Sequence, residues 1–270
     1  MKEMIKMIRE FHEQVRKQNI NAFAASTAFF LFLSIVPMLL LICAIIPYTP
    51  LSQANLMKII TDLMPDVVDP LAKSLILEVY GTSIGILSIA AVTTLWSAGK
   101  GVLALIRGLN AVNEVEDTRN YFVIRMIASF YTVIILVILV LSLFLMVFGN
   151  QLMNLLLYRV PQIRGMIAFL MNFRFLAVWG VLMFLFAAVY AYVPDKKLRF
   201  KEQLPGASFS AVGWSIFSWG FSMYVSASGS FTIYGSLSII VIVMIWLYFC
   251  MYILMIGAYI NRYLGMKSQE

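Results

Sequence analysis

Residues that bind metals or perform acid–base chemistry are scarce in this sequence. Only 12% of its 270 residues are charged, and it contains two cysteines and a single histidine, His12. No His-Cys-Asp cluster has metal-ligand spacing, and no phosphate-binding Walker loop occurs. Metal-dependent hydrolysis and nucleotide hydrolysis therefore lack their usual residues. We expect a protein that is not an enzyme, with no catalytic residue, no metal and no cofactor.

Long polar stretches are also missing, which excludes a separate water-soluble domain with a core of its own. Cys43 and Cys250 both lie inside apolar runs. That setting favours packing as small apolar side chains over a disulfide or a thiolate metal site. The first apolar run is too long for the core of a signal peptide, so we expect no cleaved leader.

Apolar residues are abundant instead, at 62% of the chain. Soluble proteins contain about 45–50%, so this excess does not fit inside one water-soluble core. Six runs approach or exceed the roughly 20 residues that cross about 30 Å of hydrocarbon. The sequence therefore predicts an all-α, polytopic membrane protein that forms a single membrane domain over residues 1–270. The predicted transmembrane helices are residues 22–46, 83–105, 123–148, 175–193, 206–226 and 233–259.

Two segments outside these spans have amphipathic patterns. Residues 1–21 place apolar side chains on one helical face, which suits a cytoplasmic helix in the headgroup region or one packed on other loops. Residues 51–82 are predicted to form short amphipathic helices over the outer face of the bundle. Within them, Asp69-Pro70 is typical of a helix start and Gly81 of a helix stop.

The distribution of Lys and Arg predicts the orientation. With the N-terminus inside, fourteen basic side chains fall on the cytoplasmic side and five on the outer side, and Lys100 lies within the second span. Cytoplasmic loops collect Lys and Arg, so this asymmetry predicts that both termini are cytoplasmic. The same rule accounts for the net charge of +7 without a nucleic-acid partner.

Lys100 is the residue most suggestive of a binding site. A charge at the centre of a bilayer costs at least about 2.5–3.5 kcal/mol, so it is a functional candidate, although near the cytoplasmic boundary it could reach water without any role. Its glycine neighbours would let a ligand or another helix approach closely. The predicted substrate-binding residues are Trp96, Ser97, Gly99, Lys100, Gly101, Arg107, Asn110 and Tyr234.

Three further regions allow two interpretations each. The arginines Arg159, Arg164 and Arg174 on the predicted outer face could hold lipid phosphates or make only generic lipid contacts. The small, hydroxyl-rich residues 224–238 could line a wet cavity or form a tight outer turn. The acidic cluster at residues 114–117 lies beside Arg119, where a solvated turn with local ion pairs is favoured over an acid/base pair.

Several motifs give the chain a resemblance to a known family. They are Ala24-Ala25, Leu33-Ser34-Ile35-Val36-Pro37, Leu95-Trp96-Ser97-Ala98-Gly99-Lys100-Gly101, Asn110 to Arg119, Val193-Pro194-Asp195, Pro205-Gly206-Ala207, Ile233-Tyr234-Gly235-Ser236-Leu237, Trp246-Leu247-Tyr248 and Gly257-Ala258. In this order they resemble the YihY/BrkB family, once labelled ribonuclease BN. The resemblance implies a six-helix bacterial inner-membrane protein with envelope or lipid-transport roles, and it supplies no catalytic set. The sequence supports the view that the ribonuclease label is a misassignment.

These observations predict a multi-pass inner-membrane transporter or flippase-like protein for a lipid or amphipathic envelope substrate. With no nucleotide site, it would run on a gradient or act passively. The expected partners are membrane lipids, chiefly anionic ones, and a second copy of the chain, but no nucleic acid. The alternative is a non-transporting scaffold of an envelope complex, and the least favoured reading is a nuclease or lipid-modifying enzyme.

Overall fold

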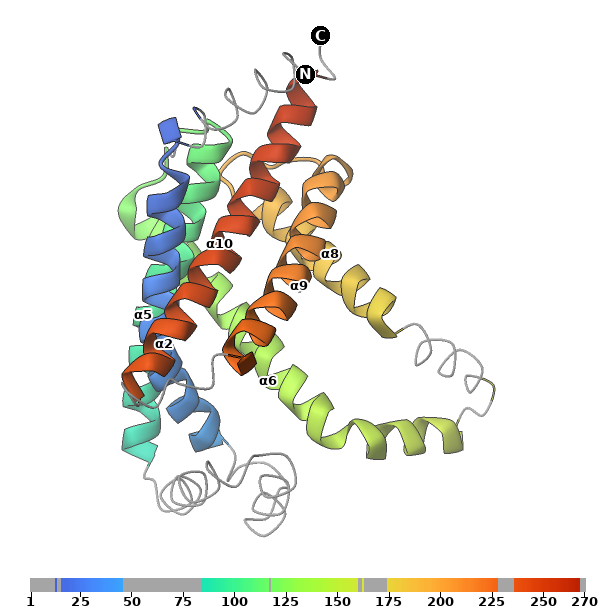
Figure 1. Ribbon diagram of the computed structural model, residues 1–270. Helices are drawn as coiled ribbons and strands as arrows, with labels where there is room; N and C mark the ends of the chain where they lie inside the picture. Colours follow the sequence, from blue (N-terminus) through green and yellow to red (C-terminus); the bar gives the residue numbers. More distant parts are fainter. Residues whose placement is uncertain are drawn as a thin grey trace.

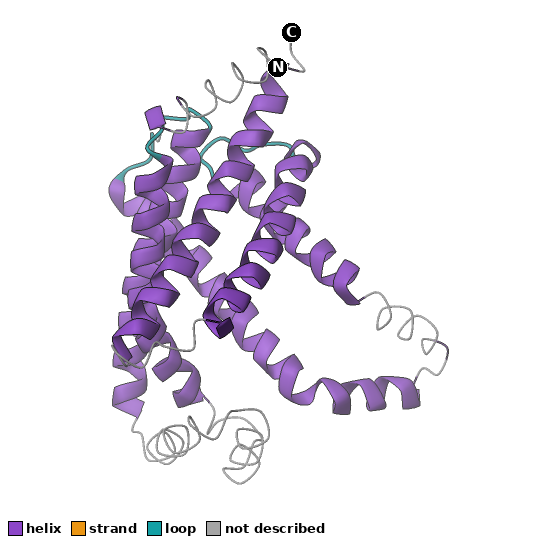
Figure 2. Cartoon of the chain, in the orientation of Figure 1, coloured by secondary structure: helices purple, strands orange, loops and turns teal. Residues whose placement is uncertain are grey.

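The computed structural model describes residues 13, 16–45, 84–116, 118–159, 162, 174–227 and 236–267. These residues form six α-helices and one short 3-10 helix and contain no strand, which confirms the predicted all-helical class (Figures 1 and 2). The helices are α2 (Ile20–Ile45), α5 (Ile84–Val112), α6 (Tyr121–Arg159), α8 (Arg174–Tyr192), η3 (Phe200–Gln203), α9 (Leu204–Ala227) and α10 (Ser236–Lys267). The predicted outer-face segment 51–82 lies outside the described residues.

One α-helix falls on each range that the sequence marks as a span, but three of them run well past their predicted ends. Helix α10 continues to Lys267 instead of ending at residue 259. Helix α5 continues to Val112 instead of ending at residue 105, and α6 continues to Arg159 instead of residue 148. The extra turns of α5 contain polar side chains, which lowered the local hydropathy. They stay helical because Ile106, Leu109 and Val112 are fully buried in the bundle, and burial of an apolar face is what stabilises most protein helices.

The six helices meet at one end of the bundle, where α5 is joined to α6 and α8 to α9 (Figure 1). We call it the connection end, after the connections 113–120 and 193–203. Helix α2 packs against α5 and α10, and α9 packs against α8 and α10. The far parts of α6 and α8 diverge from the other helices in Figure 1.

Close contact between α9 and α10 depends on two glycines. A Cβ atom at Gly206 would overlap the carbonyl oxygen of Gly257, and one at Gly257 would overlap Ser210. The Gly206 N–H donates to Asn261 Oδ1 at 2.6 Å, and Tyr190 donates from its hydroxyl to the Leu254 carbonyl at 2.7 Å. Small residues with interhelical hydrogen bonds are the usual packing device of membrane helices.

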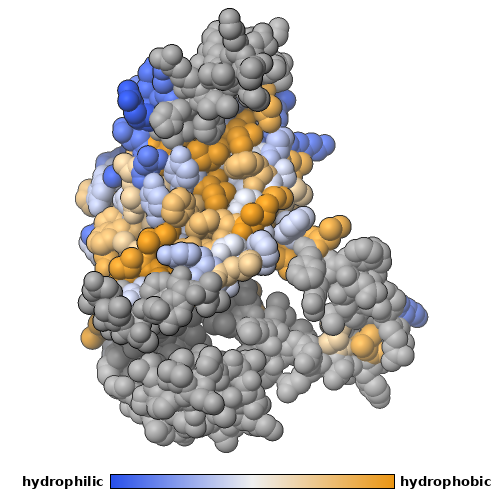
Figure 3. Space-filling model, viewed as in Figure 1, coloured by the Kyte–Doolittle hydropathy of each residue, from blue (hydrophilic) through white to orange (hydrophobic). Residues whose placement is uncertain are grey.

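Much of the surface of the described helices is apolar. In the view of Figure 3, apolar residues lie over the middle of the bundle and hydrophilic ones gather at the connection end. Among the described residues, two stretches are long and apolar enough to cross a bilayer, Tyr121–Ile138 and Ile240–Met266, and only 22% and 33% of their residues are buried. A core helix of a soluble protein would be mostly buried, so the exposure of these helices indicates apolar surroundings.

Candidate functional site

Lys100 lies in the body of α5. At ~1.5 Å per residue, it is about 24 Å from the start of the helix and about 18 Å from its end. Its ammonium Nζ is 5.4 Å from the ring centroid of Phe30 on α2 and 5.7 Å from that of Trp96, one turn earlier on α5. Cations at such distances are attracted by the negative face of an aromatic ring. The charge of Lys100 is therefore held against two rings.

A second cation reaches the same tryptophan from α6. The guanidinium carbon of Arg125 is 4.8 Å from the Trp96 ring, and Nη2 donates a hydrogen bond of 2.9 Å to the Trp96 carbonyl oxygen. The other terminal nitrogen, Nη1, is buried and has no hydrogen-bond partner. The guanidinium lies next to Gly99, where an added Cβ would be 3.4 Å from Nη1, an ordinary van der Waals contact.

Phe30, Trp96, Lys100 and Arg125 form what we call the basic–aromatic cluster. Within the described part of the chain, ion pairs join Arg119 to Asp195, Arg199 to Glu202 and Arg262 to Glu114. None of these pairs includes a cation of the cluster. Trp96 is 59% exposed, so the cluster opens onto the surroundings of α5 rather than into the core. Two positive charges are thus present at one exposed aromatic ring.

The other predicted binding residues are distributed unevenly around this cluster. Ser97 is half-buried and Arg107 is exposed. Gly101 serves helix packing, because a Cβ there would lie 3.1 Å from Leu31 of α2. Asn110 is buried and belongs to a separate network near the connection end.

Four candidates lie at or beyond the edge of the described residues. Tyr234 and Arg164 are outside them. Arg159 is the last residue of α6 and Arg174 the first of α8.

Sequence reasoning missed Phe30 and Arg125. Arg125 is one of the fourteen basic residues that the charge asymmetry assigns to the cytoplasmic side, although it lies inside the apolar stretch Tyr-Phe-Val-Ile-Arg-Met-Ile at the start of α6. That surrounding apolarity was the available signal. Phe30 had none, because one phenylalanine in an apolar run is indistinguishable from the others before α2 is packed against α5.

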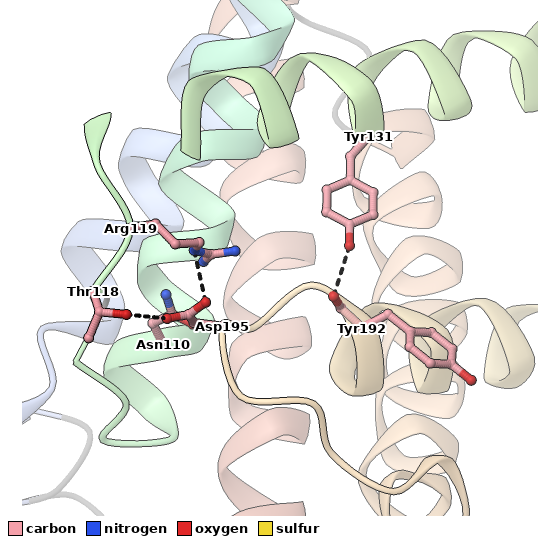
Figure 4. A network of polar contacts seen from close by, with 6 residues as sticks. All are labelled: Asn110, Thr118, Arg119, Tyr131, Tyr192 and Asp195. Atoms are coloured by element: carbon pink, nitrogen blue, oxygen red, sulfur yellow. Dashed lines mark hydrogen bonds and ion pairs between the residues drawn. The ribbon is translucent and has the colours of Figure 1, made fainter. Parts of the chain in front are cut away.

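Asp195 is the centre of the second polar network, which joins the two connections (Figure 4). Its N–H donates to Asn110 Oδ1 at 2.9 Å, and its carboxylate pairs with Arg119 Nε at 3.0 Å. The Thr118 hydroxyl makes a longer contact of 3.5 Å with the same carboxylate. Nearby, the Tyr131 hydroxyl of α6 donates to the Tyr192 carbonyl at the end of α8, at 2.8 Å. We call these contacts the connection network.

Arg262 of α10 makes a further link to the end of α5. One of its terminal nitrogens donates to the Val112 carbonyl at 2.8 Å, and the other pairs with Glu114 at 2.5 Å. The hydrogen-bonded Arg262 guanidinium lowers the pKa of Glu114 below its ordinary value of 4.5. The local pairing expected for the acidic cluster is thus replaced, for Glu114, by a contact with a distant helix. It also satisfies a carbonyl that the helix end leaves unpaired.

An enzymatic site is not evident in the described residues. Residues 81–85 read Gly-Thr-Ser-Ile-Gly, which matches the Gly-x-Ser-x-Gly pattern of a nucleophile elbow. In that motif a strand leads into the serine; here Ile84 begins α5, and the serine and the residues before it lie outside the described part of the chain. In the same residues, no three His, Cys, Asp or Glu side chains gather as a metal site would require.

The chain is similar to known proteins over nearly its whole length. The model of the family described as virulence factor BrkB matches residues 11–270. The ribonuclease-like protein YfkH of Bacillus subtilis (strain 168) is 31% identical over 252 residues, which cover 91% of this chain and 90% of that protein.

Shorter matches join the chain to bacterial UPF0761 membrane proteins. One from Vibrio vulnificus (strain YJ016) is 36% identical over 84 residues, and one from Aliivibrio salmonicida (strain LFI1238) is 35% identical over 85. Each match covers 31% of this chain and 27% of the relative. No solved structure matches the chain. The family match includes every residue of the basic–aromatic cluster and of the connection network.

Proposed function

We propose, from the premise that this chain belongs to the BrkB family of membrane proteins, that it moves an anionic lipid or amphipathic envelope substrate across or out of the bacterial inner membrane. Membership confirms the resemblance carried by the motifs. The family is not a known enzyme family, and the ribonuclease-like name belongs to the Bacillus relative. The proposed protein is a multi-pass transporter or flippase-like protein without nucleotide hydrolysis.

The proposed topology has six spans with the connection end in the cytoplasm. Each of the six helices has at least 19 residues, close to the roughly 20 that cross the hydrocarbon. The connection 193–203 supports this orientation, because it carries Lys196, Lys197, Arg199 and Lys201. An excess of Lys and Arg is typical of cytoplasmic loops. Both termini then face the cytoplasm.

The observation that carries the function is the position of the Lys100 charge. It lies about 18 Å from the end of α5, against aromatic rings and without a carboxylate partner among the described residues. Cation–π contacts offset about 0.5–2 kcal/mol of the cost of placing a charge there, and an anion would offset more. The phosphate of a lipid is the anion available at that depth, and the exposed Trp96 ring leaves the site open to it.

A lipid-movement assay tests the proposal. The purified full chain is reconstituted into vesicles with a fluorescent anionic lipid, and loss of the label from the inner leaflet is followed with a membrane-impermeant quencher. We expect the chain to accelerate this movement, and Lys100→Ala to slow it at least tenfold while Lys197→Ala leaves it unchanged. Vesicles that move lipid no faster than protein-free ones would refute transport and favour the scaffold.

A further inference from the structure

Arg125 doubles the charge of the site, and this determines which anion balances it. Lys100 and Arg125 both lie within 6 Å of the Trp96 ring, and the hydrogen bond that Arg125 makes within the described residues goes to the neutral Trp96 carbonyl. In an apolar medium, charges separated by a few ångströms interact several times more strongly than in water. A ligand that neutralises both cations is therefore favoured over one that leaves a net positive charge.

We infer that the basic–aromatic cluster binds a phosphomonoester in preference to a phosphodiester, an inference that rests on the proposed function for its site. A phosphomonoester carries about −1.5 to −2 charges at pH 7, which balances the two cations. A phosphodiester, the linkage of most membrane phospholipids, carries one negative charge and leaves one cation unbalanced. The ligand class is thus a lipid or soluble molecule with a terminal phosphate.

The geometry of Arg125 supplies the donors for that phosphate. A buried donor without an acceptor is unfavourable, and Nη1 of Arg125 is such a donor. Nη1 and the ammonium of Lys100 belong to the two cations at the Trp96 ring, and the inference assigns both to the phosphate oxygens. Arginine and lysine have complementary roles here, because the planar guanidinium donates two parallel hydrogen bonds and the ammonium acts as a point charge.

Equilibrium binding to the purified full chain in phosphatidylcholine nanodiscs tests the preference. The probes are phosphatidic acid, a phosphomonoester lipid, and phosphatidylglycerol, a phosphodiester lipid with the same acyl chains. We expect at least tenfold tighter binding of phosphatidic acid. Arg125→Gln and Lys100→Gln should each remove the preference, and Arg125→Lys should retain most of it. Lys197→Gln, an exposed lysine in the connection 193–203, is the matched control.

Inorganic phosphate as a competitor identifies the source of the phosphate group. If inorganic phosphate at millimolar concentration displaces phosphatidic acid, the site recognises the phosphate alone. If it does not, the acyl chains contribute to binding. Both results agree with the inference. Equal affinity for the two lipids, or a preference that survives Arg125→Gln, would overturn it. If the chain prefers phosphatidic acid but moves no lipid, the binding inference stands and the proposed transport is refuted. If it moves lipid without this preference, transport stands and the binding inference is refuted.

Discussion

Arg119 and Arg125 are six residues apart, yet within the described residues only Arg119 forms an ion pair with a carboxylate. Arg119 lies in the connection 113–120 and pairs with the carboxylate of Asp195. Arg125 lies one turn inside α6, stacks on Trp96 and leaves Nη1 without a partner. The comparison teaches that the charge of Arg119 is balanced from within the chain, whereas the cations of the basic–aromatic cluster have no carboxylate partner among the described residues and, in the proposed function, take an anion from outside.

The difference predicts that substitutions of charged residues in the two regions change the stability of the fold with opposite signs. Removing one member of a buried ion pair leaves the other uncompensated, which costs stability. Replacing an unpaired, desolvated cation by an apolar side chain removes a cost instead. Substitutions in the two regions should therefore move stability in different directions.

The largest effect is expected for Asp195→Ala. Arg119 and Asp195 are only 17% and 20% exposed, so loss of the carboxylate removes the ion pair of a partly buried guanidinium and should lower the free energy of unfolding by about 2 kcal/mol. Thermal unfolding in detergent measures the change. Glu202→Ala is the matched control, because Glu202 pairs with Arg199 at the exposed surface and such pairs contribute about 0–1 kcal/mol. Equal shifts for the two variants would contradict the balance of the Arg119 charge from within the chain.

The second effect has the opposite sign. Arg125→Met should leave the free energy of unfolding unchanged or raise it by about 1 kcal/mol, because an apolar side chain of similar length replaces a guanidinium with an unsatisfied nitrogen. The same protein should lose its preference for phosphatidic acid. Arg119→Met serves as the comparison and should destabilise. If both methionine variants unfold at the same lowered temperature, Arg125 has a structural role and the contrast fails.

A smaller stabilisation is expected for Lys100→Met. The ammonium of Lys100 is half-buried and already attracted by two rings, so its removal should raise the free energy of unfolding by about 0.5 kcal/mol. The measurement is the same thermal unfolding, with Arg107→Met on the exposed side of α5 as the control. A loss of stability larger than that of the control would show that the rings need the cation for packing.

The smallest effect concerns pH and Glu114. Because Arg262 lowers the pKa of this carboxyl below 4.5 in the folded chain, the pair stabilises the fold above pH 4.5, and the stabilisation is lost as the pH falls through the folded pKa. Glu114 is 60% exposed, so solvent screening limits the contribution to about 0.5 kcal/mol. Glu114→Gln should unfold slightly earlier than the unmodified chain at pH 7. At the lowest pH the two should unfold together, and a difference that persists there would assign the effect to something other than the charge.

How much of the fold and of the candidate site could be predicted depends on how far apart the interacting residues are in the sequence. Helix positions can be predicted from apolar runs, because the length of a run, and whether it is enough to cross a bilayer, can be read from consecutive residues. The end of α5 was missed because the burial of Ile106, Leu109 and Val112 is a property of the packed bundle. Asn110 and Asp195 are 85 residues apart, and no local pattern pairs them. Lys100 and Trp96 were found because one turn of a helix separates them, whereas Phe30 and Arg125 come from other helices.

The length of α6 has a consequence for the lipids around the chain. Its 39 residues extend about 58 Å at 1.5 Å per residue, nearly twice the hydrocarbon thickness of about 30 Å. A helix of that length does not stand upright in a flat bilayer, and Figure 1 shows it bending away from the bundle in its far part. Tilt, curvature along the interface and local thickening of the bilayer are the ways in which such a mismatch is relieved. In the proposed topology this relief takes place beside α6, so that lipids entering or leaving at that side would meet a bilayer adapted to a long helix.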